Sequence, residues 1–266
     1  PQKAEQIARK QSYTTHASVA GSDGCALLSQ LLCSLIQGLE WHEAIGSTND
    51  RACEIAREEG SRAHGRIVGT EEQASGRGRR GASWISEPGK GLTFSLVLSP
   101  EWKREHWGWL SMAAALAVCE GGLRPRGVNP LIKWPNDVLV EGSKICGILI
   151  ETAGDDCAVV GIGLNVNERG FPPGLKAVSL FQLLGAETER ETLMEDIRKK
   201  LMDYIHLEES LIAEQAWNLL AWKGQEVETA SGERGRIRGF GGNAEWGARW
   251  WQMACQTNRW GMGGQC

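Results

Sequence analysis

Residues 76–81 have the sequence Gly-Arg-Gly-Arg-Arg-Gly, which places three arginines among three glycines. Such a segment can present backbone N–H groups and guanidinium groups together to a polyphosphate. The spacing also matches the G-x-G-x-x-G pattern of dinucleotide-binding proteins. That pattern requires a helix directly afterwards, whereas Pro88 and Gly89 indicate a loop. The segment therefore predicts a phosphate-binding loop, with a solvated basic loop or an Arg-Gly nucleic-acid tether as the alternatives.

Three further segments place polar or small residues where a ligand could bind. Residues 46–50, Gly-Ser-Thr-Asn-Asp, are typical of a helix N-cap loop. Residues 133–137, Lys-Trp-Pro-Asn-Asp, end a strand at a proline and then form a turn or a ligand site, and Lys144 opens the next apolar strand. A lysine there is commonly a snorkelling surface residue. Glycines in residues 161–167 permit close approach of a ligand, or mark a packing bulge.

In this order, the segments resemble biotin–protein ligase. The resemblance covers about residues 41–240, and its most specific parts are the Gly-Arg loop and the Lys-Trp-Pro-Asn-Asp run. Glu72-Gln73, Trp84 and Gly147-Ile148 also match, while Ala82 stands where many relatives carry a basic residue. Lipoate–protein ligases share the fold but lack this arginine loop.

The resemblance implies an ATP-dependent, AMP-forming ligase. Such an enzyme activates biotin with ATP to biotinyl-5′-AMP and transfers biotin to a lysine of a biotin carboxyl carrier protein, part of acetyl-CoA carboxylase or a related carboxylase. Mg²⁺ is expected through the ATP phosphates, without a metal site of the protein's own. Because both reacting groups are anions, fixed positive charge must offset their repulsion. A lipoate-type ligase and an Arg-Gly nucleic-acid-binding module are the alternatives.

The resemblance also implies roles for individual residues. Lys144 and Arg77 are the expected catalytic residues, with Lys144 bonding the carboxylate and the bridging oxygen. The expected biotin-binding residues are Ser47, Thr48, Asn49, Gln73, Gly76, Arg77, Gly78, Arg79, Lys144 and Gly147. The expected ATP-binding residues are Arg77, Arg79, Arg80, Trp84, Lys133, Asn136 and Asn165.

The elements that must position these residues predict an α+β fold, a mixed β-sheet flanked by helices, as in the class II synthetase-like biotin/lipoate ligase fold. We expect strands over residues 66–70, 92–98, 131–133, 138–140, 145–151 and 158–165. We expect helices from the residue 46–50 cap to Glu59, over residues 105–119 with a stop at Gly121-Gly122, from a Thr188–Glu191 capping box to about Leu207, and over residues 211–222.

Three regions are expected: a loose N-terminal segment with one amphipathic helix over residues 1–40, a catalytic domain over 41–222, and an incomplete SH3-like β domain over 223–266. Leucines at helical spacing from Leu27 to Leu39 predict the first helix. Four of the twelve tryptophans lie between Trp246 and Trp260, where strand periodicity is lost. A shifted reading frame from Arg249 onward restores a strand–turn–strand pattern, so we interpret this tail as a frameshift product, which the DNA sequence tests.

Composition narrows the class of protein further. With 266 residues, 41% hydrophobic and a net charge of −4, the chain can bury a core and lacks the basic excess of nucleic-acid-binding proteins. The eight cysteines form no C-x-x-C pair, which argues against a zinc site and against a disulfide framework. We therefore expect reduced thiols in the cytoplasm. No apolar stretch reaches the roughly 20 residues of a membrane span. Because only about 40 residues precede Trp41, we expect a short form of the ligase without a DNA-binding domain. We expect the protein to be a monomer or homodimer.

Overall fold

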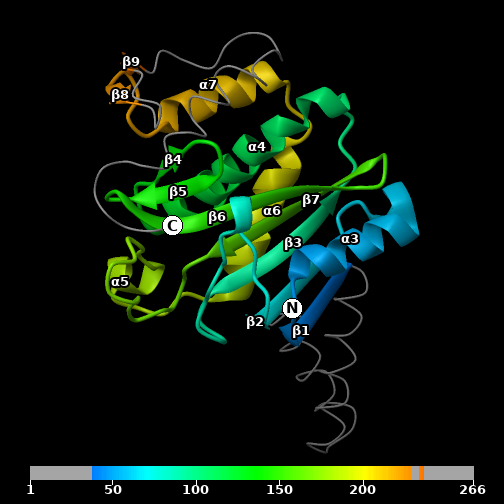
Figure 1. The fold of residues 1–266 in the computed structure, drawn as a ribbon, viewed down its shortest axis with the longest axis horizontal. Coiled ribbons are helices and arrows are strands. Elements are labelled where there is room, and N and C mark those ends of the chain that lie inside the picture. The colour runs from blue at the N-terminus through cyan, green and yellow to red at the C-terminus, as the bar shows by residue number, and fades with distance from the viewer. Residues whose placement is uncertain (1–37, 229–233, 237–266) are drawn as a thin grey trace, which may run out of the picture.

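The structure, a computed structural model, describes residues 38–228 and 234–236 (Figure 1). A seven-stranded sheet has the order β1-β2-β3-β7-β6-β5-β4, in which only the β1–β2 pair is parallel. Its strands are β1 (Leu39–Ile45), β2 (Ile67–Gln73), β3 (Leu92–Leu98), β4 (Leu131–Lys133), β5 (Asp137–Val140), β6 (Ser143–Ala153) and β7 (Cys157–Leu164). The helices are α3 (Thr48–Glu59), α4 (Leu110–Ala117), α5 (Leu180–Leu184), α6 (Arg190–Tyr204) and α7 (Glu209–Leu219).

Helices cover both faces of this sheet (Figure 1). Helix α3 contacts β2, β3, β6 and β7, whereas α4 packs on β6 and β7 from the opposite side, together with α6. Side chains alternate between the two faces of a strand. In β3, Phe94 and Leu96 enter the large core with α4 and α6, while Val97 joins the smaller core under α3. The predicted mixed sheet flanked by helices is therefore confirmed.

Helix α3 begins and ends where the sequence predicts. The side chain of Ser47 accepts a hydrogen bond from the backbone N–H of Asp50, and Gly60 closes the helix with a positive φ of 60°. Ala52, Ile55 and other apolar residues of α3 are buried against the sheet. This packing fixes the N-terminal turn of α3, with Thr48 and Asn49, beside the strands.

The helix predicted over residues 105–119 extends further at both ends. A 3-10 helix (Arg104–Trp109) precedes α4, a π-helix (Val118–Leu123) follows it, and a 3-10 turn (Arg124–Arg126) ends the segment. The expected stop at Gly121-Gly122 was wrong. A Cβ on Gly121 would lie 2.7 Å from the Asp196 carbonyl oxygen, so these glycines allow α6 to approach closely.

Two other local predictions also need correction. Helix α6 begins after Glu189 without a side-chain cap, and the Thr188 N–H donates instead to Asn167 Oδ1, so the predicted Thr188–Glu191 capping box is absent. A complete capping box stands at Ser179 and Gln182, before α5. Leu39 starts β1 rather than extending a leucine helix.

Shorter elements complete the described chain. A 3-10 turn (Gly60–Ala63) follows α3, and another (Arg79–Gly81) lies in the Gly-Arg loop. Strands β8 (Glu226–Glu228) and β9 (Arg234–Arg236) pair antiparallel. The helix predicted before Leu39 and the tail beyond Arg249 lie outside the described residues. No described helix has the length and apolar character needed to cross a membrane.

Candidate active site

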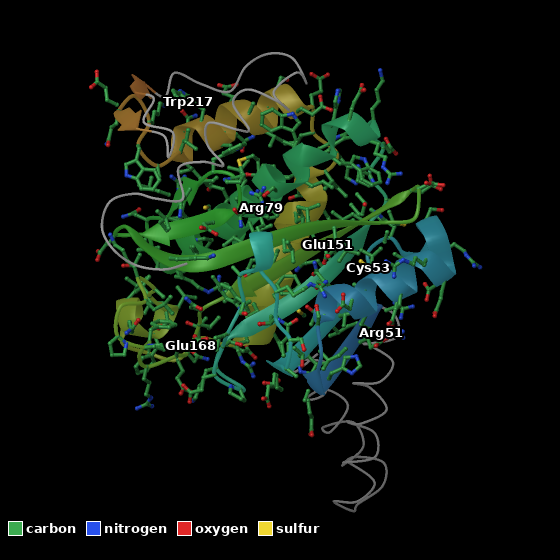
Figure 2. The ribbon with its side chains drawn as sticks, in the orientation of Figure 1. Arg51, Cys53, Arg79, Glu151, Glu168 and Trp217 are labelled. Atoms are coloured by element: carbon green, nitrogen blue, oxygen red, sulfur yellow. The ribbon has the colours of Figure 1, made fainter. Side chains whose placement is uncertain are left out.

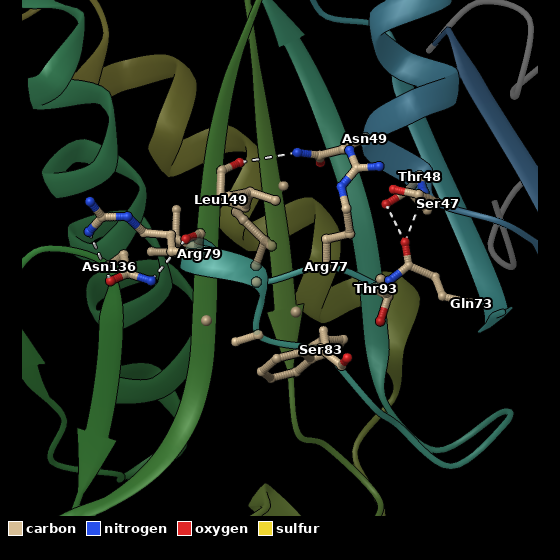
Figure 3. A pocket seen from close by; sticks show the side chains of 18 of the residues that line it. Ser47, Thr48, Asn49, Gln73, Arg77, Arg79, Ser83, Thr93, Asn136 and Leu149 are labelled. Carbon is tan, nitrogen blue, oxygen red and sulfur yellow. Dashed lines mark hydrogen bonds between the residues drawn. The ribbon is translucent and has the colours of Figure 1, made fainter. Parts of the chain in front are cut away.

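A pocket lies on the face of the sheet that carries α3, under the Gly-Arg loop (Figure 3). Segments that are distant in sequence line it: the start of α3, the end of β2, the Gly-Arg loop, β3, the start of β5 with the residue before it, β6 and β7. The lining residues are Ser47, Thr48, Asn49, Gln73, Arg77, Gly78, Arg79, Ala82, Ser83, Trp84, Thr93, Asn136, Asp137, Lys144, Gly147, Ile148, Leu149, Gly161, Ile162 and Gly163.

The floor of this pocket is made of glycines. Gly147 of β6 pairs with Gly163 of β7, and the Trp84 indole lies against both. A Cβ on Gly163 would lie 2.3 Å from Trp84 Cε2. The indole Nε1 is buried, and no described residue accepts its hydrogen bond. The glycines therefore make room for the Trp84 indole, which places in the pocket an N–H donor that a ligand can use.

A cationic corner borders the glycine floor. Lys144 Nζ lies 2.7 Å from Asp137 Oδ1 and 5.6 Å from the centroid of the Trp84 ring. Lys133 Nζ lies 3.5 Å from the other oxygen of Asp137. Two lysines thus share one carboxylate whose side chain is only 13% exposed, which leaves positive charge in excess at this end of the pocket.

The opposite end of the pocket is lined mainly by uncharged polar side chains, with the ion pairs of Arg77 at its edge. Gln73 Oε1 accepts a hydrogen bond from the Thr48 backbone N–H at 2.8 Å and lies 3.2 Å from the Thr48 hydroxyl. Ser95 Oγ lies 2.7 Å from Thr48 Oγ1 and 2.6 Å from Asn49 Oδ1. Gly161 makes room for Asn49, because a Cβ there would lie 2.2 Å from Oδ1. This end can bind a neutral polar group through several directed hydrogen bonds.

The two described arginine side chains of the loop point to different sides of the pocket (Figure 3). Arg79 Nη1 donates to Asn136 Oδ1 at 3.4 Å, near the cationic corner. Arg77 donates to Asp50 at 2.6 Å and to Glu151 at 3.1 Å and 3.2 Å, and the hydrogen bond to Asp50 raises the pKa of the guanidinium. Arg79 is therefore directed toward the anion-binding end.

Hydrogen bonds within the Gly-Arg loop fix its shape. The N–H of Gly78 donates to the Ala82 carbonyl at 2.6 Å, and the N–H of Trp84 donates to the Gly76 carbonyl at 2.9 Å. Arg77 and Ser83 form an isolated antiparallel bridge. The loop is thus a narrow hairpin, and this hairpin carries the Trp84 indole onto the glycine floor.

Most residues predicted from the sequence meet in this pocket, but three do not line it. Gly76 lies in the loop behind it, and Lys133 reaches only Asp137. Asn165 uses its amide to bond the carbonyl oxygens of Lys144 and Val178, so it holds the β6 region in place. The side chain of Arg80 lies outside the described part of the structure.

Sequence reasoning missed several residues of the site. Asp137 belonged to a recognised motif but was given no role, although it binds both lysines. Thr93 and Ser95 lie on one face of β3, and a period-two reading of that strand could have found them. Glu151 carried no spacing signal. Among the described residues, no cluster of three His, Cys, Asp or Glu side chains could hold a metal.

Comparison with known proteins shows which family this geometry resembles. Residues 42–167 match the Biotin/lipoate A/B protein ligase family. The matched residues include most of the seven-stranded sheet, and this sheet has the catalytic fold of biotin protein ligases. The solved biotin protein ligase from Aquifex aeolicus in complex with biotin and ATP aligns with a TM-score of 0.67 and 26% identity, covering 76% of this chain and 88% of that one.

Curated relatives include enzymes from two bacteria. The bifunctional ligase/repressor BirA of Bacillus subtilis is 35% identical over 181 residues, which is 64% of this chain and 55% of that protein. The biotin–[acetyl-CoA-carboxylase] ligase of Mycobacterium tuberculosis is 35% identical over 161 residues, 59% of each chain. The chain thus spans little more than half the length of these relatives.

Proposed function

We propose that this protein is a biotin–[biotin carboxyl-carrier protein] ligase that forms biotinyl-5′-AMP from biotin and ATP. The observation that carries the proposal is a single pocket with a neutral polar end, a glycine floor and a cationic end. Biotin has a matching layout, since an uncharged ureido ring is joined by an apolar chain to a carboxylate. The curated ligases and the Aquifex structure with biotin and ATP support the same reading.

In the first step, a carboxylate oxygen of biotin attacks the α-phosphorus of ATP. The bond from the α-phosphorus to the bridging oxygen breaks, and pyrophosphate leaves with the electron pair. Negative charge gathers on the α-phosphate oxygens and on the bridging oxygen during this exchange. Lys144 stands at the end of the pocket where this charge would develop, and a preorganised cation there stabilises the transition state more than the ground state.

Other residues would hold the reactants in line. Thr48, Asn49 and Gln73 would bind the ureido ring, and Gly147 and Gly163 would let Trp84 lie close to the strands beside the ligand. Arg79 with Asn136 would contact the phosphates. Asn136 and Asp137 are the oxygen-bearing side chains at this end, so Mg²⁺ brought with ATP would be held mainly by phosphates and would offset their charge.

In the second step, the neutral amine of a carrier-protein lysine attacks the biotinyl carbonyl carbon. An amide bond forms, AMP leaves, and the amine loses a proton. The carrier would be the biotin carboxyl carrier protein of acetyl-CoA carboxylase or a related carboxylase, as the name of the M. tuberculosis relative suggests. The four described cysteines are buried free thiols, which favours a cytoplasmic setting.

The test is biotin-dependent exchange of labelled pyrophosphate into ATP, followed by ATP-dependent biotinylation of a carrier domain. We expect biotin to support both reactions. Lipoate in place of biotin provides the matched comparison. Exchange that lipoate supports and biotin does not would assign the chain to the lipoate branch, and exchange with neither acid would overturn the proposal.

A further inference from the structure

Glu151 lies on the same face of β6 as Gly147 and Leu149, at the edge of the pocket. Its side chain is 33% exposed, and its carboxylate binds two groups from different elements. Oε2 accepts from Asn49 Nδ2 at 2.7 Å and from Arg77 Nη2 at 3.1 Å, and Oε1 lies 3.2 Å from the same Nη2. The carboxylate of Glu151, which Figure 2 labels, therefore joins the start of α3 to the Gly-Arg loop.

The bonds from Asn49 Nδ2 to Glu151 Oε2 at 2.7 Å and to the Leu149 carbonyl at 3.4 Å determine the direction of the neighbouring hydrogen bonds. A carboxylate only accepts, so the Asn49 NH₂ group must face Glu151 and its Oδ1 must face Ser95. Ser95 has one hydroxyl proton, which it donates to Asn49 Oδ1. The 2.7 Å contact between Ser95 and Thr48 then needs the proton of Thr48, which this shorter contact takes in place of the 3.2 Å contact with Gln73 Oε1. The oxygen of Thr48 is left to accept a hydrogen bond from an N–H group of a ligand.

The bonds to Arg77 hold the loop at the same point. The guanidinium lies between Glu151 on the sheet and Asp50 on α3, bound to both without any contribution from a ligand. The loop hairpin begins at Arg77 and brings Trp84 to the glycine floor. A fixed Arg77 therefore sets where the rest of the hairpin lies.

We propose that Glu151 is a positioning residue with two tasks: it anchors the loop through Arg77, and it sets the hydrogen-bond polarity of Thr48 through Asn49. The second task rests on the proposed function, because it concerns recognition of the ureido N–H groups of biotin. The first task does not. In this arrangement Arg77 is an anchor of the loop, and Glu151 touches neither substrate.

The anchor is tested on the ligand-free protein by trypsin, which cleaves after arginine. We expect Glu151→Gln to increase cleavage of the Arg77–Gly78 bond by about three- to tenfold, the scale of a partly exposed ion-pair network. Glu120→Gln is the matched control, since Glu120 is a 28% exposed carboxylate that binds Arg124 at 2.8 Å, away from the pocket. Cleavage in Glu151→Gln equal to that of the control would overturn the anchoring task.

The polarity task is tested by steady-state kinetics. In Glu151→Gln only the longer 3.4 Å bond to the Leu149 carbonyl still requires the Asn49 NH₂ group in its present place. The new amide can therefore turn its own NH₂ toward Asn49 and reverse the Asn49, Ser95 and Thr48 bonds. We expect the KM for biotin to rise about tenfold, as for a misdirected buried hydrogen bond, with the KM for ATP unchanged. A biotin KM equal to that of the wild type would refute this task. If the wild type shows no biotin-dependent activity, the proposed function and the polarity task are both refuted. The trypsin result then still decides the anchoring task, because it needs no ligand.

Asp50→Asn separates the two tasks and guards against a folding defect in Glu151→Gln. Asp50 is 54% exposed and binds Arg77 but makes no contact with Glu151 or Ser95 that would alter their polarity. We expect faster cleavage after Arg77 in Asp50→Asn, with the biotin KM of the wild type. Unchanged cleavage in this variant would contradict the anchor even if Glu151→Gln did not fold.

Discussion

Gly147 and Gly163 are direct partners across the β6–β7 ladder, and the Trp84 indole fills the space above both. A Cβ on Gly147 would lie 3.1 Å from both Lys144 Nζ and Trp84 Cζ3. The two glycines thus set the distance of the loop and of the lysine from the sheet at once. Their role is to admit the Trp84 indole between the strands and the loop, rather than to bend either strand.

Gly163→Ala should impair the reaction more than it destabilises the fold. The added methyl group displaces Trp84, a side chain on a loop, so the core remains packed. We expect adenylation to fall by about tenfold or more, because a displaced loop misplaces the reacting groups. Gly170→Ala is the control, since nothing lies within 4 Å of a Cβ there. Pyrophosphate exchange and urea unfolding measure the two effects, and equal exchange in both variants would contradict the prediction.

Lys144→Gln should reduce adenylation by about 10²-fold while leaving ATP binding nearly intact, because its contact strengthens only as charge shifts in the transition state. Asp137 retains Lys133 in this variant, so the corner should stay folded. Exchange rates and nucleotide titration give the two values. A near-normal rate would mean that Lys144 is a surface lysine that binds Asp137 and nothing more.

Release of biotinyl-adenylate should distinguish the two arginines. Arg79 is directed to Asn136 at the anion-binding end, whereas Arg77 is held by Asp50 and Glu151. We expect Arg79→Ala to speed loss of the adenylate by about tenfold, the scale of a charge-assisted contact, and Arg77→Ala to have a smaller effect. Dissociation of purified adenylate complexes measures both rates. The reverse order would return the phosphate role to Arg77.

Glu168→Gln should stabilise the protein at neutral pH. Burial raises the pKa of Glu168, which is 2% exposed and whose Oε1 has no hydrogen-bond partner in the described chain. A raised folded-state pKa favours the protonated form, so this residue costs stability as pH rises above its unfolded value. The variant should therefore gain most in urea unfolding at pH 8, with the gain shrinking toward pH 4. A gain independent of pH would contradict this.

The sequence predicted those helices and strands whose ends are set by neighbouring residues in the chain. Ser47 and Gly60 mark the two ends of α3, and the apolar run at Leu92–Leu98 is β3 residue for residue. Strand β1 was missed because most of its side chains are half-exposed and its pairing with β2 is parallel, with a helix between them. The predicted helix stop at Gly121 was wrong because a glycine is needed there for the close approach of the α6 backbone. The residues next to Gly121 in the sequence do not reveal this contact.

The same division applies to the site. The loop arginines, Lys144 and the Lys-Trp-Pro-Asn-Asp run carry recognisable spacing, and most of them do line the pocket. Glu151 does not, because a single carboxylate on a strand resembles any surface residue. Its significance comes from Asn49 and Arg77, which are separated from it by 102 and 74 positions. Only the folded chain brings them together.

This separation has a consequence for how the chain folds. The bond between Asn49 and Glu151 closes a loop of about one hundred residues, and β3 pairs with β7 although β4, β5 and β6 lie between them in the sequence. Contacts so distant in sequence form slowly, because the chain loses conformational entropy on closing the loop before the contacts stabilise it. Biotin binding should thus appear only in the last refolding phase, after most of the helical circular-dichroism signal has returned. The rate at which biotin binding returns would therefore measure the rate at which the sheet closes.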